Sequence, residues 1–91
     1  QKQMAIANIL GTYPGLPFVL IGDSGEKDAD IYLEIARRYP DRVLAIYLRT
    51  VRHAARMKRV RGLVAQQDHT PVRLVDRSGE ILDHLRELDI L

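Results

Sequence analysis

The sequence contains no cysteine among its 91 residues. This absence excludes a disulfide framework, a thiolate zinc site and a thiol nucleophile, and it leaves oxygen and imidazole groups for any chemistry. No uninterrupted apolar run is longer than six residues, whereas a membrane-spanning helix needs roughly 20. A spanning helix is therefore excluded. A chain of this length has room for one modest hydrophobic core.

Apolar residues recur with the periods of alternating helices and strands. The helical period predicts helices at residues 2–12, 28–39, 51–66 and 79–88, the last of them capped by Ser78. Short, continuous apolar runs predict strands at residues 17–22, 43–48 and 72–75. The order α-β-α-β-α-β-α predicts a three-layer α/β fold, a parallel sheet with helices on both faces.

Three carboxylates lie within six residues in the turn after the first predicted strand, namely Asp23, Glu26 and Asp28. In open α/β sheets, ligands bind at the carboxyl ends of the strands. Carboxylates held on a turn there are hard oxygen ligands of the kind that Mg²⁺ prefers. The same residues are also common in ordinary strand-to-helix turns, where Asp28 or Ser24 would simply cap the helix. Local pattern alone leaves both interpretations open.

A wider resemblance favours the catalytic interpretation. Residues 16–32, with the Gly-Asp-Ser-Gly block at 22–25 and the trailing Asp28, continue into residues 35–40 and 42–49. This stretch resembles the catalytic domain of the actin-patch-type phosphatidate phosphatases, a family of the haloacid-dehalogenase-like superfamily of Mg²⁺-dependent phosphatases. Residues 70–91 resemble its closing strand and helix more loosely. The resemblance implies the C-terminal part of a Rossmannoid core, so we expect residues 1–91 to be a single partial domain.

The resemblance also implies roles for individual residues. Asp23 would be a direct Mg²⁺ ligand, and Asp28 would be the second acid, acting directly or through a metal-bound water. Lys2 matches the position of the lysine that steadies the nucleophile and the phosphoryl charge. We expect Ser24 and Arg49 to bind phosphate or substrate at the same sheet edge. The alternative for Arg49 is an ion pair with Asp23 or Glu26.

The family's nucleophile is absent from this sequence. Its mechanism needs an Asp-x-Asp-x-Thr motif, and the only Asp-x-Asp here is Asp28-Ala-Asp30, followed by Ile31. The resemblance therefore implies Mg²⁺-dependent hydrolysis of a phosphate monoester, through an aspartyl-phosphate, in the full-length protein only. Phosphatidate or another phospholipid would be the substrate. We expect the 91-residue chain to be inactive, and the parent to be cytoplasmic and peripheral to membranes.

Acidic residues are missing from residues 42–67, which contain seven Lys and Arg residues. Within this stretch a cationic stripe is expected on the third helix, formed by Arg49, Arg52, Arg56 and Arg59. The stripe could contact anionic membranes or nucleic acid, or be a solvated face, but the lack of stacking aromatics disfavours nucleic acid. A non-catalytic binding module using residues 49–61 is therefore the alternative function. An exposed strand edge would also permit self-association.

Overall fold

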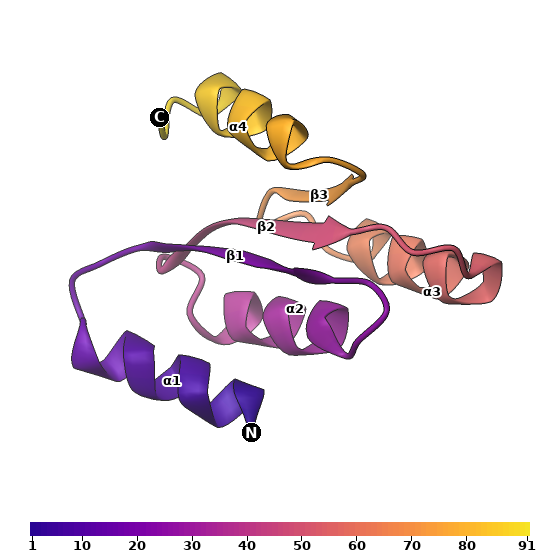
Figure 1. Cartoon of the computed structure of the whole chain (residues 1–91). Coiled ribbons are helices and arrows are strands. Elements are labelled where there is room, and N and C mark those ends of the chain that lie inside the picture. The colour runs from indigo at the N-terminus through magenta and orange to yellow at the C-terminus, as the bar shows by residue number, and fades with distance from the viewer.

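The computed structural model describes all of residues 1–91 as three parallel strands alternating with four helices (Figure 1). In chain order the elements are α1 (Lys2–Thr12), β1 (Phe18–Asp23), α2 (Asp28–Arg38), β2 (Val43–Arg49), α3 (Ala54–Ala65), β3 (Val72–Val75) and α4 (Ser78–Glu87). The predicted α/β class and element order are confirmed. None of the four helices is both long and apolar enough to span a membrane.

The sheet has β2 at its centre, paired in parallel with β1 on one side and β3 on the other. The register places Asp23 opposite Arg49, and Arg49 opposite Val75. The carboxyl ends of all three strands therefore meet at one end of the sheet, where the sequence places its candidate site. The far side of β1 is a sheet edge.

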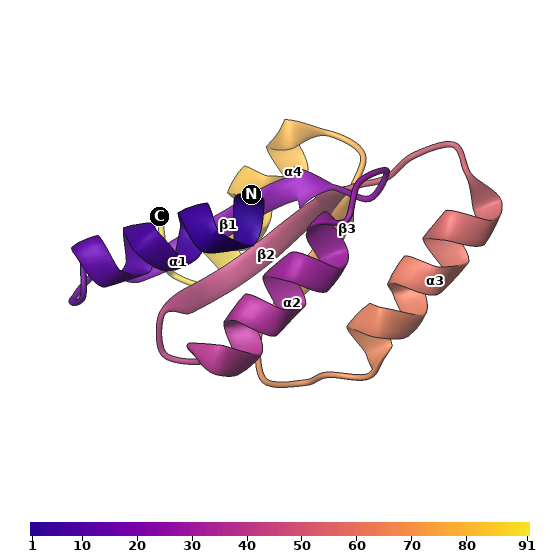
Figure 2. The same cartoon turned by 90° about the horizontal axis from the view of Figure 1, so that it is seen from below.

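Each face of the sheet has its own apolar core, because successive residues of β2 point to opposite faces. On one face Ile46 packs in a cluster with Ile35 of α2 and Leu10 of α1. On the other face Tyr47 packs with Leu85 of α4. Figures 1 and 2 show the result, with α1, α2 and α3 on one side of the sheet and α4 on the other.

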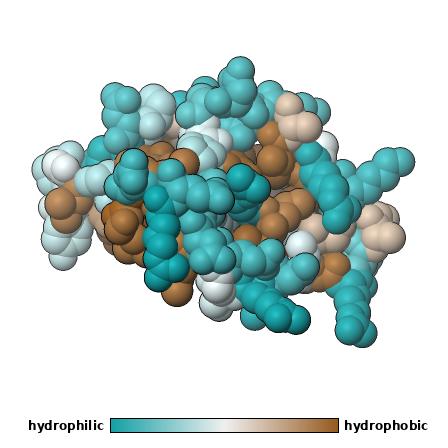
Figure 3. All heavy atoms as spheres, turned by 90° about the horizontal axis from the view of Figure 1, so that it is seen from above, coloured by the Kyte–Doolittle hydropathy of each residue, from teal (hydrophilic) through white to brown (hydrophobic).

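The face that carries α4 is only partly covered. Figure 3 looks onto this face and shows hydrophobic side chains gathered between hydrophilic ones. Ile21 of β1 is 59% exposed, and Leu82 of α4 is 46% exposed. One short helix is too small to cover all three strands, so part of this apolar surface meets solvent.

The third helix begins later than its sequence pattern predicts. α3 starts at Ala54, and the imidazole Nδ1 of His53 caps it by accepting the backbone N–H of Arg56 at 3.1 Å. Arg49 is the last residue of β2, and Arg52 precedes the helix. The prediction of one helical stripe of four arginines is therefore wrong, because two of the four lie outside the helix.

The start of the last helix also differs from the prediction. Ser78 is the first residue of α4, and its hydroxyl does not cap the helix. Instead, Glu80 Oε2 accepts the backbone N–H groups of Asp76 at 2.6 Å and Arg77 at 2.7 Å. The Glu80 carboxylate thus satisfies the backbone N–H groups of the two residues that precede the helix, as the acidic residue of a capping box does for the N-cap amide.

Candidate functional site

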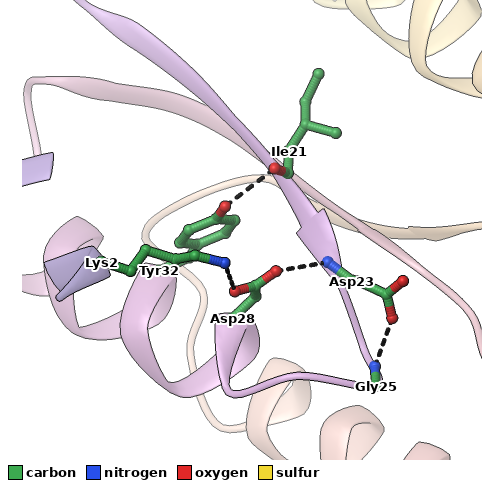
Figure 4. A network of polar contacts seen from close by, with 6 residues as sticks. All are labelled: Lys2, Ile21, Asp23, Gly25, Asp28 and Tyr32. Atoms are coloured by element: carbon green, nitrogen blue, oxygen red, sulfur yellow. Dashed lines mark hydrogen bonds and ion pairs between the residues drawn. The ribbon is translucent and has the colours of Figure 1, made fainter. Parts of the chain in front are cut away.

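Asp28 joins three elements at the carboxyl end of the sheet (Figure 4). It is the first residue of α2 and is only 3% exposed. Its Oδ1 forms an ion pair with the Lys2 ammonium of α1, and its Oδ2 accepts the backbone N–H of Asp23 at 2.8 Å. The hydrogen bond to Asp28 raises the pKa of Lys2 above its ordinary value. Lys2 of α1 and Asp28 of α2 therefore lie together at this end of the sheet.

Asp23 lies at the end of β1 with both carboxylate oxygens engaged. Oδ1 accepts the backbone N–H of Gly25 at 2.6 Å, and Oδ2 lies 3.2 Å from Arg49 Nη2. The Gly25 hydrogen bond, and then the Arg49 guanidinium, lower the pKa of Asp23, so this carboxylate is ionised at neutral pH. Of the two roles that the sequence left open for Arg49, the structure shows the ion pair with Asp23.

Gly22 allows the Asp28 side chain to lie directly against β1. A Cβ atom on Gly22 would lie 2.5 Å from Asp28 Oδ2 and 2.6 Å from Tyr32 Cε2. The Tyr32 hydroxyl donates to the Ile21 carbonyl at 3.0 Å, and burial raises the pKa of Tyr32. Sequence reasoning did not identify Tyr32. Its place four residues after Asp28, on the same face of a helix, is the signal that could have found it.

Neither Ser24 nor Asp28, the two residues suggested as caps of α2, performs that role. The N-cap of α2 is Lys27, without a side-chain hydrogen bond. Ser24 is completely buried, and its hydroxyl has no hydrogen-bond partner. It lines a neighbouring cleft of about 1010 Å³ with Lys2 and Asp28, not the cavity that Asp23 and Arg49 line. The Ser24 backbone N–H donates to the Arg49 carbonyl at 2.9 Å, but the two residues line different cavities.

A cavity of about 520 Å³ lies between the three strand ends and the start of α4. Four of the five predicted site residues line it, namely Lys2, Asp23, Asp28 and Arg49. The loop between β3 and α4 adds Asp76 and Arg77, and Asp76 Oδ1 accepts a hydrogen bond from the Thr50 hydroxyl. Sequence reasoning identified neither Asp76 nor Arg77 as a site residue. The available signal was their position at the carboxyl end of β3, where Asp76 directly follows the strand and Arg77 is the second residue after it.

Two arginines of α3 contact the acidic turn and the helix that follows it. Arg56 donates to the Gly25 carbonyl, and Arg59 donates to both carboxylate oxygens of Asp30 at 2.6 and 3.1 Å. These contacts tie α3 to the turn after β1 and to the first turn of α2. Arg52, Arg56 and Arg59 are all exposed, and of the three only Arg56 and Arg59 donate side-chain hydrogen bonds within the chain.

The protein-family model of the phosphatidate phosphatase APP1 catalytic domain matches residues 1–50. The chain is 47% identical over 49 residues, 54% of its length, to phosphatidate phosphatase APP1 of Saccharomyces cerevisiae. It is 37% identical over 51 residues, 56% of its length, to an uncharacterized protein of Schizosaccharomyces pombe. The chain spans 8% of the length of each relative. No solved structure gives a significant match. With more than half of its length matched, the chain belongs to the family of the phosphatidate phosphatase APP1 catalytic domain.

Proposed function

We propose that this chain supplies the metal-binding and charge-neutralising part of a Mg²⁺-dependent phosphatase site that acts on a phosphate monoester. The observation that carries the proposal is the Lys2–Asp28–Asp23 network, in which α1, α2 and β1 bring one ammonium and two carboxylates to one cavity. Phosphatidate is the substrate class that the name of the matching family supports.

The donor set of the cavity fits Mg²⁺. This ion binds through one or two carboxylates and keeps several waters, and Asp23 and Asp28 provide two carboxylates. No group of three or more metal-binding side chains is present in the chain, so water and substrate oxygens would complete the coordination. Four carboxylates and three cationic side chains line the cavity. The one excess negative charge favours the binding of a divalent cation.

Each residue of the network has a defined task in this proposal. A bound Mg²⁺ would supply positive charge to the phosphoryl oxygens. Asp23 and Asp28 would hold it, and the contacts with Gly25 and Arg49 lower the pKa of Asp23, which keeps it ionised to a lower pH than an ordinary aspartate. Lys2 keeps its ammonium at the cavity through the Asp28 ion pair, where it would balance charge on the transferring group.

The nucleophile is not among these residues. The sequence holds no Asp-x-Asp-x-Thr motif, so hydrolysis through an aspartyl-phosphate needs residues from outside 1–91. We therefore propose that these residues form part of a larger catalytic domain and are inactive by themselves. Phosphate release by the isolated 91-residue chain in the presence of Mg²⁺ would contradict this proposal.

The proposal is tested by Asp23→Asn in the full-length protein. The variant keeps the shape of the side chain but loses its negative charge, so Mg²⁺-dependent phosphate release from phosphatidate should fall to background, with an unchanged circular dichroism spectrum. Asp83→Asn is the matched control, because the side chain of Asp83 is 78% exposed and lies outside the cavity. Activity retained by Asp23→Asn would show that Asp23 does not hold the metal.

The alternative of a binding module built on residues 49–61 gains no support from the geometry. Arg49, Arg56 and Arg59 contact Asp23, Gly25 and Asp30 within the chain. Contact with anionic membranes, together with the cytoplasmic location, stays a prediction. Sedimentation with vesicles that contain phosphatidate, over a series of salt concentrations, is the measurement that tests the membrane contact.

A further inference from the structure

The cations that line the 520 Å³ cavity differ in their partners. Lys2 is paired with Asp28 and Arg49 with Asp23. Arg77 lines the same cavity, is exposed and forms no ion pair, although the carboxylate of Glu26 lines the cavity too. A guanidinium that no internal carboxylate engages keeps its planar set of N–H donors for a ligand.

The backbone that carries Arg77 is held in place from two sides. Glu80 Oε2 accepts the N–H groups of both Asp76 and Arg77, which fixes the turn into α4. The Thr50 hydroxyl donates to Asp76, and the Thr50 backbone N–H donates to the Val75 carbonyl at 2.9 Å. The side chain of Arg77 therefore starts from a fixed point at the rim of the cavity. The conformation of the side chain is then free to adjust to a ligand.

Ser78 adds a second donor beside Arg77. It is exposed, lines the cavity, and its hydroxyl makes no hydrogen bond within the chain. The acceptors opposite are largely engaged, because Asp23 and Asp28 have partners on both of their carboxylate oxygens. Free donors facing engaged acceptors suit a ligand that brings its own acceptor oxygens, such as a phosphate group.

One wall of the cavity is apolar. Ile21, Val75 and Ile81 line it together with the charged residues, and Ile21 is 59% exposed. The hydrophobic side chains visible in Figure 3 belong to this same face of the molecule. A ligand with a carbon skeleton next to its phosphate can cover this wall, whereas inorganic phosphate cannot.

We propose that Arg77, with Ser78 beside it, binds the phosphate group of a phosphate monoester in this cavity. Both residues lie beyond residues 1–50, the part that the family model matches, so the family match assigns them no role. The identity of the ligand as the substrate rests on the proposed function. The contact between Arg77 and the phosphate rests on the geometry of the cavity.

The experiment is a calorimetric titration of the full-length protein with glycerol 3-phosphate, in EDTA so that no Mg²⁺-dependent turnover occurs. Arg77→Gln removes the guanidinium and should weaken binding about tenfold, because hydrogen bonds to charged groups are among the strong ones. Arg73→Gln is the matched control, since Arg73 is an exposed arginine of β3 that does not line the cavity. It should bind like the wild type.

A parallel titration with inorganic phosphate distinguishes the ester from free phosphate. Tighter binding of glycerol 3-phosphate, with a loss in Arg77→Gln, supports the proposal. The proposal is overturned if the wild type does not bind the ester, if Arg77→Gln binds it as well as the wild type, or if only inorganic phosphate responds. Absence of Mg²⁺-dependent hydrolysis in a wild type that binds the ester would instead overturn the proposed function alone.

Discussion

A missing side chain at Gly22 is what allows the candidate site to form. The Asp28 carboxylate and the Tyr32 ring both occupy the space that a Cβ atom would take. Because Asp28 also pairs with Lys2 and accepts the Asp23 amide, its displacement would disturb the rest of the network.

Gly22→Ala is therefore expected to destabilise the protein by about 1–3 kcal/mol, the usual cost of overpacking, and to weaken Mg²⁺ binding. Urea unfolding and a calorimetric Mg²⁺ titration measure the two effects. Gly62→Ala in α3 is the control, because nothing lies within 4 Å of the position of its Cβ atom. Loss of a helical glycine there should stabilise the protein by about 0.5–1 kcal/mol. Equal stability of the two variants would show that Asp28 moves aside freely.

The lowered pKa of Asp23 predicts a specific acid sensitivity. A carboxylate whose pKa is lower in the folded state contributes stability above its unfolded pKa of about 3.9, and this stability is lost as the pH falls through the folded pKa. Asp23→Asn removes the titration, so unfolding free energy should fall less steeply below about pH 4 than in the wild type. Urea unfolding at a series of pH values tests this. Superimposable slopes would mean that Asp23 has the same pKa in both states.

At the scale of elements, α4 is attached to the sheet by one polar contact within an apolar layer. Tyr47 of β2 is completely buried, and its hydroxyl lies 2.7 Å from Nδ1 of His84 in α4. The two rings meet edge to face, with centroids 5.6 Å apart. The N-terminal end of α4 lines the cavity. By holding α4 on the sheet, this contact helps to position Ser78, the first residue of the helix, and Arg77 just before it.

Tyr47→Phe keeps the ring and removes the hydroxyl, and it should lower the unfolding free energy by about 1 kcal/mol, the usual net value of a hydrogen bond. Thermal and urea unfolding measure the loss. Tyr13→Phe, at a position that is 52% exposed, should leave stability unchanged. If Tyr47→Phe is as stable as the wild type, the hydrogen bond between Tyr47 and His84 does not hold α4 on the sheet.

For the whole molecule, the consequence of the three-stranded sheet is an exposed edge along β1. That strand pairs only with β2, and Ile21 on it is largely exposed. Unpaired edges with apolar residues favour association between chains. The 91-residue chain is therefore expected to associate as its concentration rises.

Light scattering over a concentration series tests this expectation. Ile21→Lys places a charge on the edge strand and should shift the series towards the monomer, as charged edge residues do in natural sheets. Leu82→Lys, on α4, is the control of similar exposure away from that edge. A constant monomer mass at high concentration would contradict self-association through β1.

Much of the fold could be predicted because its signals are local. The apolar runs at residues 17–22 and 43–48 and the helical periods between them depend on neighbours in sequence, and the structure places elements there within one residue at most ends. The start of α3 was missed, because the His53 cap depends on which backbone amide its imidazole accepts. That choice is not visible in a pattern of apolar residues.

The candidate site was predictable only in part. Asp23 and Arg49 each end a strand, and parallel strands bring their carboxyl ends together, so the two could be placed at one edge from the sequence. Their ion pair, however, depends on side-chain conformations. The burial of Ser24, the contact of Tyr32 with Gly22 and the place of Arg77 depend on distances between elements that no sequence spacing encodes.

The amino-acid sequence by itself determined the parallel α/β class and the edge at which Asp23 and Asp28 lie. Both follow from local propensity and from the alternation of helices with strands. The partners of each charged group followed from packing in three dimensions. Lys2 and Asp28 are 26 residues apart and form an ion pair only because α1 packs against α2. Arg77 follows β3, and Asp23 ends β1. They line one cavity only because both strands pair in parallel with β2, which brings their carboxyl ends to the same end of the sheet. Side chains interact through space at a few ångströms, so contacts between distant residues exist only once the chain has folded.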